Sequence, residues 1–308
     1  MNPIQPNIQI SVDLTNPGQF FACCGLLELA DRLWPGAEGW FDVCRGAFLL
    51  GRHTGEALDP DRLITTIASC PVRNTMSPEE VERREELGGL LKQLRREIKS
   101  AADEKKKELQ QRQEVLDTEK KNLDRQWRER PVELGSPFNL QVDWFLDSFA
   151  GGSRFKTWAG QQSVIDIFRA MHAAIADSEW AKVDCMTWLK RASADTGVPF
   201  NFDSNLGPQA SSVDVGYSLD ALNLSIQTRP FIEFAAFIGL QRFRPCQIGN
   251  ENRYRYRMWS TPLPLSVASI AACTFLSVPD ATDFEFRLLY RTKYLKFFLP
   301  STIAGAST

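Results

Sequence analysis

The first 70 residues show short apolar stretches with the spacing of strands and of a helix. Residues 8–14 alternate apolar and polar side chains, which predicts a strand. Residues 20–33 are apolar on nearly every face and predict a buried helix, which Asn16 can cap with Pro17 at its first position. Two further runs predict a strand pair, 39–43 and 46–50. The order strand, helix, hairpin is typical of half a ferredoxin-like or RRM-like unit.

A highly charged segment begins after Ser77. Residues 79–130 contain 15 Lys/Arg and 14 Asp/Glu, and apolar residues recur every seven positions, which predicts a helical seam with solvated flanks. Pro78 and Pro131 mark a start and a stop. One straight helix of this length would span about 78 Å. We therefore expect a projecting coiled coil or a hairpin broken at residues 88–89 or 100–103, with balanced charges that favour a solvated face over a phosphate-binding one.

The pattern of a compact domain resumes after Pro137. Alternation predicts strands at 138–146, 253–260 and 284–298, and helical spacing predicts helices at 162–176, 179–191, 231–240 and 265–274. The fold class is therefore α+β, with an RRM/ferredoxin-like N-terminal unit and a long charged helical insertion. We divide the chain into an α/β unit at 1–76, the insertion at 77–131 and an α+β domain at 132–308.

Composition narrows the class of protein. The chain has 308 residues, a net charge of -2 and a pI near 5.9, which argues against a free-standing protein that coats DNA. Seven cysteines without a Cys-x-x-Cys pair indicate reduced thiols in a cytoplasmic protein. The N-terminus does not have the pattern of a signal peptide, and no apolar run reaches the roughly 18 residues of a membrane span. We expect no membrane partner.

The sequence offers little catalytic chemistry. Its two histidines, His53 and His172, belong to no metal-binding or nucleophile motif, and no phosphate-cradling glycine loop occurs. We therefore expect a protein that is not an enzyme, with no catalytic residue, no metal and no cofactor. A cysteine nucleophile would need a histidine close by in space, which sequence alone does not reveal.

Three patches combine basic or amide side chains with aromatic residues and are candidates for nucleic-acid binding. Residues 151–162 combine glycines and an aromatic core with donors, although the same pattern fits a plain loop around a buried Trp158. Residues 241–259 are the most basic and aromatic stretch. Residues 284–297 carry further basic residues. The candidate contacts are Arg154, Lys156, Gln161, Gln162, Arg242, Arg244, Asn250, Arg253, Arg255, Arg257 and Lys293.

The strongest of these candidates is a row of three arginines. If residues 253–259 form a strand, Arg253, Arg255 and Arg257 share one face, about 6.6 Å apart, which is close to the spacing of phosphates along a nucleic-acid strand. Arginine also stacks on bases and makes bidentate contacts. The alternative is that these arginines pair with acids on the helical insertion.

Parts of the chain resemble a known family. The block 16–30 (Asn-Pro-Gly-Gln-Phe-Phe-Ala-Cys-Cys-Gly-Leu-Leu-Glu-Leu-Ala) with 37–41, the loop 156–162 and the block 235–245 resemble CRISPR-associated proteins of the type I-G (formerly I-U) effector complexes, large-subunit-like members included. About 40 residues carry this likeness. It implies a subunit of a crRNA-guided, Cascade-like surveillance complex. Such subunits help to recognise the protospacer-adjacent motif, hold target DNA and dock the helicase–nuclease, whereas this chain is short for a large subunit.

We therefore expect a non-catalytic subunit in antiviral defence. Its expected partners are other CRISPR effector subunits, crRNA, target double-stranded DNA and the helicase–nuclease. A first alternative is an assembly or adaptor protein that docks a partner through the insertion at 77–130. A second alternative is a nuclease or RNA-processing enzyme that uses His53 or His172.

Overall fold

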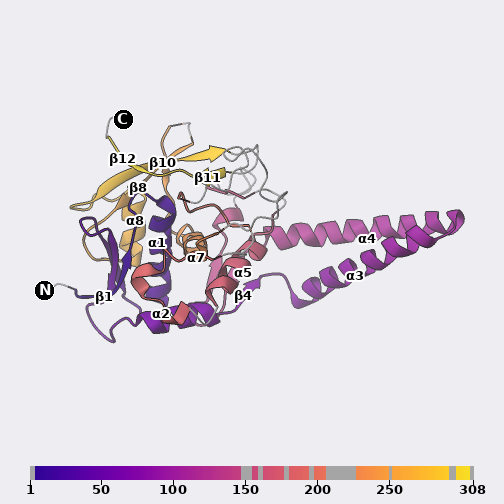
Figure 1. Ribbon diagram of the computed structural model, residues 1–308, viewed down its shortest axis with the longest axis horizontal. Helices are drawn as coiled ribbons and strands as arrows, with labels where there is room; N and C mark the ends of the chain where they lie inside the picture. The colour runs from indigo at the N-terminus through magenta and orange to yellow at the C-terminus, as the bar shows by residue number, and fades with distance from the viewer. Residues whose placement is uncertain are drawn as a thin grey trace.

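The computed structural model describes residues 4–146, 155–158, 162–176, 180–193, 198–205, 227–249, 252–290 and 296–305. A first, antiparallel sheet has the strand order β1-β3-β2-β9 (Figure 1). Its strands are β1 Pro6–Ser11, β2 Glu38–Asp42, β3 Ala47–Gly51 and β9 Leu263–Pro264. The first three follow the order of half a ferredoxin-like unit. Strand β9 joins them from far along the sequence, and the RRM-like likeness beyond this order stays a prediction.

Helix α1, Pro17–Leu33, lies inside the body, and its residues from Pro17 to Ala30 are all buried. The predicted cap is present, since the Asn16 side chain accepts a hydrogen bond from the Gln19 amide and Pro17 occupies the first turn. Phe20 lies between two sheets, with its ring centroid 4.2 Å from that of Tyr256 and 5.4 Å from that of Phe41. The prediction of a buried helix is confirmed because α1 is covered on all sides.

Helix α7, Pro230–Gly239, packs against α1 at backbone contact distance. A Cβ atom added to Gly25 would lie 2.0 Å from the Ala235 carbonyl oxygen, and one added to Gly239 would lie 2.0 Å from the Phe21 oxygen. Only glycine allows two helices to approach this closely. Residues at the two N-termini are joined through Asp203, and Arg242 beyond the end of α7 pairs with Glu28 late in α1, so the helices run in the same direction.

A second sheet covers α1 with aromatic side chains. Its order is β11-β10-β8-β7, with β12 also paired to β10. The strands are β7 Cys246–Gln247, β8 Arg253–Met258, β10 Thr282–Tyr290, β11 Lys296–Phe298 and β12 Thr302–Ile303. The short helix α8, Leu265–Ala272, links the two sheets between β9 and β10.

A helical hairpin projects from the third sheet (Figure 1). This sheet pairs β4 Val72–Asn74 with β5 Val132–Leu134 and β5 with β6 Leu140–Val142. The chain leaves the body after β4, forms α3 Pro78–Ser100 and α4 Asp103–Glu129, and returns into β5. The Thr75 amide donates to the Pro131 carbonyl, 3.3 Å away, so the two ends of the excursion lie side by side.

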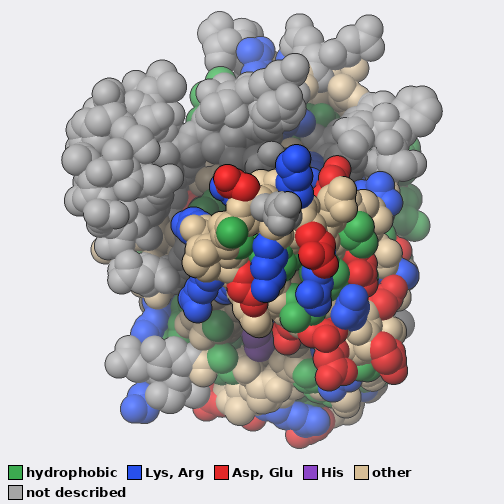
Figure 2. Space-filling view, turned by 90° about the vertical axis from the view of Figure 1, so that its right-hand side faces the viewer, with side chains coloured by type: hydrophobic (Ala, Val, Ile, Leu, Met, Phe, Trp, Pro, Cys, Tyr) green, Lys and Arg blue, Asp and Glu red, His purple; other side chains and the backbone are tan. Residues whose placement is uncertain are grey.

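The hairpin has its own stabilising contacts. Ser77 and Glu80 form a capping box at the start of α3, and the turn lies at Ala101 and Ala102, within the predicted break at 100–103, while 88–89 stay helical. Buried leucines form the seam between the helices: Leu87, Leu91, Leu94 and Leu109. Viewed towards the tip, Lys/Arg and Asp/Glu side chains are interspersed (Figure 2). The two helices therefore pack against each other through an apolar stripe that charged side chains flank on both sides.

Helix α2 is Pro60–Ser69, and α5, Val164–Ile175, lies within the helix predicted at 162–176. The predicted helix at 179–191 is wrong over its described residues 180–191. This segment forms two 3-10 turns, Trp180–Lys182 and Cys185–Thr187, because the Asp184 side chain caps a new turn by accepting from the Met186 amide.

Two predicted strands are also corrected. Of the strand predicted at 138–146, only β6, Leu140–Val142, forms a strand, and Trp144–Leu146 form a 3-10 helix. The strand ends there because the Gln241 side-chain oxygen accepts hydrogen bonds from the backbone amides of Asp143 and Trp144. The run 284–298 is not one strand. Strand β10 and strand β11 pair with each other in antiparallel fashion, so the chain reverses direction between them.

One continuous hydrophobic core includes residues of both the 1–76 and 132–308 segments, as well as Trp127 at the base of α4. The α+β class is confirmed, whereas the division into three domains stays a prediction. Within the described ranges, no helix combines the length and the apolar character needed to cross a membrane.

Candidate functional site

The arginine row predicted from sequence exists on strand β8. Burial alternates along the strand, so Arg253, Arg255 and Arg257 share the outer face while Tyr254 and Tyr256 point into the core. The first two arginine side chains are 36% and 38% exposed, and Arg257 is 19% exposed. The predicted shared face is therefore confirmed.

Carboxylates on the neighbouring strand β10 neutralise much of this row. Glu285 lies opposite Arg255 and accepts hydrogen bonds from both Arg255, at 2.5 Å, and Arg253, at 2.6 Å. Asp283 lies opposite Arg257 and binds it through two nitrogens, at 2.6 and 3.0 Å. The hydrogen bond from Arg255 is the main reason that the pKa of Glu285 lies below its usual value.

These ion pairs change the interpretation of the row. The alternative of pairing with acids on the insertion is wrong, because Glu285 and Asp283 come from the adjacent strand. Each of the three arginines is bound to at least one of these two carboxylates, so the face does not present three unpaired cations. The same period-two alternation that reveals the arginines also places Asp283 and Glu285 on one face of β10, so the sequence held the signal for these partners.

The remaining described candidates are dispersed. Arg242 pairs with the buried Glu28 at 2.8 Å, and Arg244 is exposed. Lys156 lies 5.7 Å from the ring centroid of Trp158, and burial together with nearby Lys296 lowers its pKa. Gln162 precedes α5. Trp158 itself is buried, as the plain-loop interpretation predicts, and Arg154, Gln161, Asn250 and Lys293 lie outside the described residues.

The structure also reveals a Cys–His contact that sequence could not show. Cys70 Sγ lies 3.7 Å from His172 Nε2. However, the same Nε2 atom lies 2.7 Å from the Ile67 carbonyl oxygen, which can only accept, so this nitrogen carries the proton and cannot deprotonate the thiol. Burial raises the pKa of Cys70 to about 11 and lowers that of His172. The pair is therefore a buried packing contact without an activated nucleophile.

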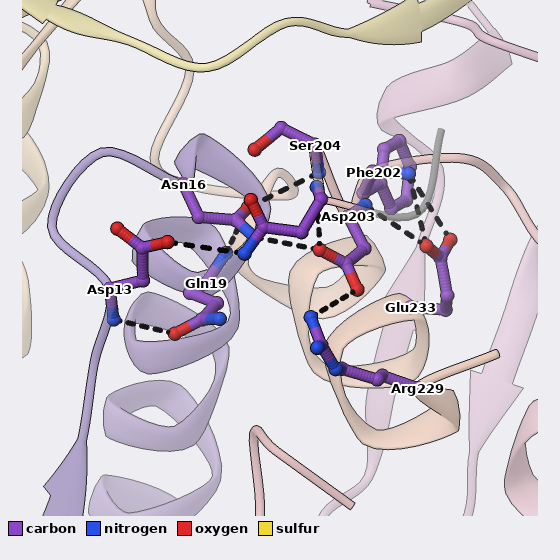
Figure 3. Close-up of polar contacts among 9 residues, drawn as sticks. Asp13, Asn16, Gln19, Phe202, Asp203, Ser204, Arg229 and Glu233 are labelled. Atoms are coloured by element: carbon purple, nitrogen blue, oxygen red, sulfur yellow. Dashed lines mark hydrogen bonds and ion pairs between the residues drawn. The ribbon is translucent and has the colours of Figure 1, made fainter. Parts of the chain in front are cut away.

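A second cluster, the inter-helix polar network, joins the N-termini of α1 and α7 (Figure 3). Asp203 is its central residue. One Asp203 carboxylate oxygen accepts from the Asn16 side-chain amide at 2.7 Å, and the other accepts from Arg229 at 3.1 Å. The Ser204 backbone amide donates to the Asn16 side-chain oxygen at 3.4 Å, so the buried Asn16 and Asp203 and the half-buried Arg229 belong to one set of contacts. The network fixes the irregular segment that contains Phe202 and Asp203 against both helix ends.

Glu233 on α7 is the most perturbed acid of this network. Its carboxylate accepts hydrogen bonds from the backbone amides of Phe202 and Asp203, both at 3.1 Å, and its side chain is buried (Figure 3). Burial, with the neighbouring Asp203 charge, raises the pKa of Glu233 to about 8, although the amide hydrogen bonds oppose this. Such a group can hold or release a proton near neutral pH, but it is sealed inside the core.

The described residues provide no metal centre, since no group of three His, Cys, Asp or Glu side chains among them converges on a point. His53, on the surface, lies 3.9 Å from Glu38. The alternative of an enzyme that uses either histidine stays a prediction.

Comparisons with protein-family models, with curated proteins and with solved structures find no match for this chain. The likeness to type I-G CRISPR proteins thus stays a prediction. The geometry that bears on function consists of the largely paired arginine face, the sealed polar network and the projecting hairpin.

Proposed function

We propose that this chain is a non-catalytic subunit of a multisubunit, nucleic-acid-guided complex, of the type I CRISPR surveillance kind that its sequence resembles. Its partners are the other effector subunits and the crRNA or target DNA that they hold. The projecting hairpin is the observation that carries this proposal.

The hairpin contributes little to the core of its own chain. Trp127 at its base joins that core, but most of the hairpin projects away from the body (Figure 1). Helices of 23 and 27 residues extend about 35–40 Å. A rigid arm of this length, held between two paired strands, supports a role in reaching another molecule.

The core of the body favours binding over catalysis. The Cys70 thiol is not activated, and Glu233 is sealed from solvent. The alternative of an assembly or adaptor protein depends on the same arm, and it differs in one respect: an adaptor would bind protein partners without retaining nucleic acid.

Co-purification tests this proposal. The full-length tagged chain, expressed with the proteins encoded beside its gene, should retain partner subunits together with a short RNA of repeat-derived sequence. A shortened-arm variant, in which residues 92–112 are replaced by a short Gly/Ser turn, keeps Leu87, Trp127 and the Arg83–Glu119 pair at the base. We expect it to fold while losing part of the complex.

Two results would contradict the proposal. If the full-length chain retained neither protein nor nucleic acid, the chain would act alone. If protein partners were retained but nucleic acid was absent from every preparation, the adaptor alternative would hold instead.

A further inference from the structure

Charge is segregated along the hairpin, although its total is nearly balanced. The distal half, residues 92–112, contains eight Lys/Arg and four Asp/Glu. The rest of 79–130 contains seven Lys/Arg and ten Asp/Glu. The tip is therefore basic and the base is acidic, a difference that a count over the whole insertion conceals.

Among the described residues, the ion pairs lie mostly near the base of the hairpin, which leaves most of the cations at the tip without a paired carboxylate. Near the base, Arg83 binds Glu119 and Glu86, while Arg84 and Lys120 both bind Asp124, at distances of 2.5–2.8 Å. In the distal half, the one described ion pair joins Arg95 to Asp117 at 3.4 Å. The other seven distal cations form no ion pair with a carboxylate whose position the structure describes: Lys92, Arg96, Lys99, Lys105, Lys106, Lys107 and Arg112.

The chemistry of the distal surface fits phosphate better than protein. Residues 92–112 include no aromatic residue and no methionine, and the leucines among them that are buried, Leu94 and Leu109, belong to the seam. Protein interfaces are enriched in aromatic residues, methionine and arginine and depleted in lysine. Exposed lysines with glutamines are instead the groups that neutralise and contact a phosphate backbone.

We infer that the distal end of the α3–α4 hairpin binds the phosphate backbone of a nucleic acid through Lys105, Lys106 and Lys107 on α4 with Lys92, Arg96 and Lys99 on α3. The inference rests on the proposed function and moves its main electrostatic contact from the arginine face of β8 to the tip of the arm. The contact is independent of base sequence, because it uses point charges on a helix surface.

The test compares two matched triple variants of α4 in the full-length chain. The distal variant is Lys105→Gln/Lys106→Gln/Lys107→Gln. The proximal control is Lys121→Gln/Arg125→Gln/Arg128→Gln, which removes three cations from the base of the same helix. Lysine, arginine and glutamine have similar helix propensities, so both variants should fold, which circular dichroism checks.

Binding is measured by fluorescence anisotropy with a labelled 30-bp DNA duplex and with a labelled single-stranded RNA, between 50 and 200 mM salt. Loss of three phosphate contacts should reduce the slope of log K against log salt on duplex DNA by about 2.7. We expect this for the distal variant, with a much smaller change for the control. An effect on only one of the two probes identifies the nucleic acid that the arm contacts.

Three outcomes would overturn the inference. They are absence of binding by the full-length chain to either probe, equal effects of the two triple variants, or loss of partner proteins from nuclease-treated preparations of the distal variant with unchanged nucleic-acid binding. The last result would identify the tip as a docking site for an acidic protein. None of the three contradicts the proposed function, which is judged by co-purification of the unaltered chain.

Discussion

Glu233 should make the stability of this protein depend on pH in an unusual direction. Its pKa rises from an ordinary value of 4.5 to about 8 in the folded chain, mainly through burial. Below pH 4.5 the group is protonated in both the folded and the unfolded states. Between these two values the unfolded chain releases the proton while the folded chain keeps it, so the free energy of unfolding falls as pH rises.

The size of this effect follows from the shift. Each pKa unit corresponds to about 1.36 kcal/mol, so the full difference is about 4–5 kcal/mol, complete above pH 8. Replacement of Glu233 by Gln removes the titration, while the amide oxygen can still accept from the Phe202 and Asp203 amides. The advantage of wild type over Glu233→Gln should therefore shrink between pH 5 and pH 9 and can reverse its sign.

Urea denaturation of both proteins at five pH values from 5 to 9 measures this difference. Glu28→Gln is a suitable control, because Glu28 is a second buried acid, paired with Arg32 and Arg242, and Glu233 remains intact in this variant. Its unfolding free energy should keep the same fall with pH. A constant difference between wild type and Glu233→Gln across the range would refute the argument for a protonated buried carboxyl.

Two other predictions concern helix packing and thiol chemistry. Gly239→Ala places a Cβ atom 2.0 Å from the Phe21 carbonyl oxygen, so we expect a loss of about 3 kcal/mol or more in thermal or urea unfolding. Gly89→Ala on the open face of α3 is the control and should raise stability by about 1 kcal/mol. A thiol reagent at pH 8 should modify the exposed Cys44 rapidly and the buried Cys70 only on unfolding. Rapid labelling of Cys70 itself in the folded chain, identified by peptide mass mapping, would contradict the described burial, whereas the half-buried Cys185, Cys246 and Cys273 can label at intermediate rates.

The period of apolar residues along the chain predicted most helices and strands, but it did not predict which strands pair with each other. The apolar run around Phe20 predicted a helix covered on all sides, and alternation around Tyr254 predicted which side chains of β8 face outwards. Neither pattern states which strand lies next to which. The pairing of Arg255 with Glu285 depends on a register between strands 30 residues apart, and such register is set by packing across the whole sheet.

The inter-helix polar network was invisible in the sequence for a related reason. The sequence predicts Asn16 only as the N-cap of a helix. Asp203 lies in a stretch rich in polar residues, which predicts only an irregular segment. Their contact spans 187 residues. The close approach of α1 and α7 at Gly25 and Gly239 brings these groups together, and a glycine inside a helix does not reveal which backbone it admits.

Because the hairpin is attached between β4 and β5, its direction depends on packing at the base, and its reach depends on the length of its two helices. A tilt of about 10° at the base would move a tip about 35 Å away by roughly 6 Å, so small changes of packing around Trp127 would be amplified at the far end. Insertion of one heptad into each helix would lengthen the reach by about 10 Å while the seam stays in register and the body stays unchanged. Reach and direction of the arm are thus set by different parts of the chain.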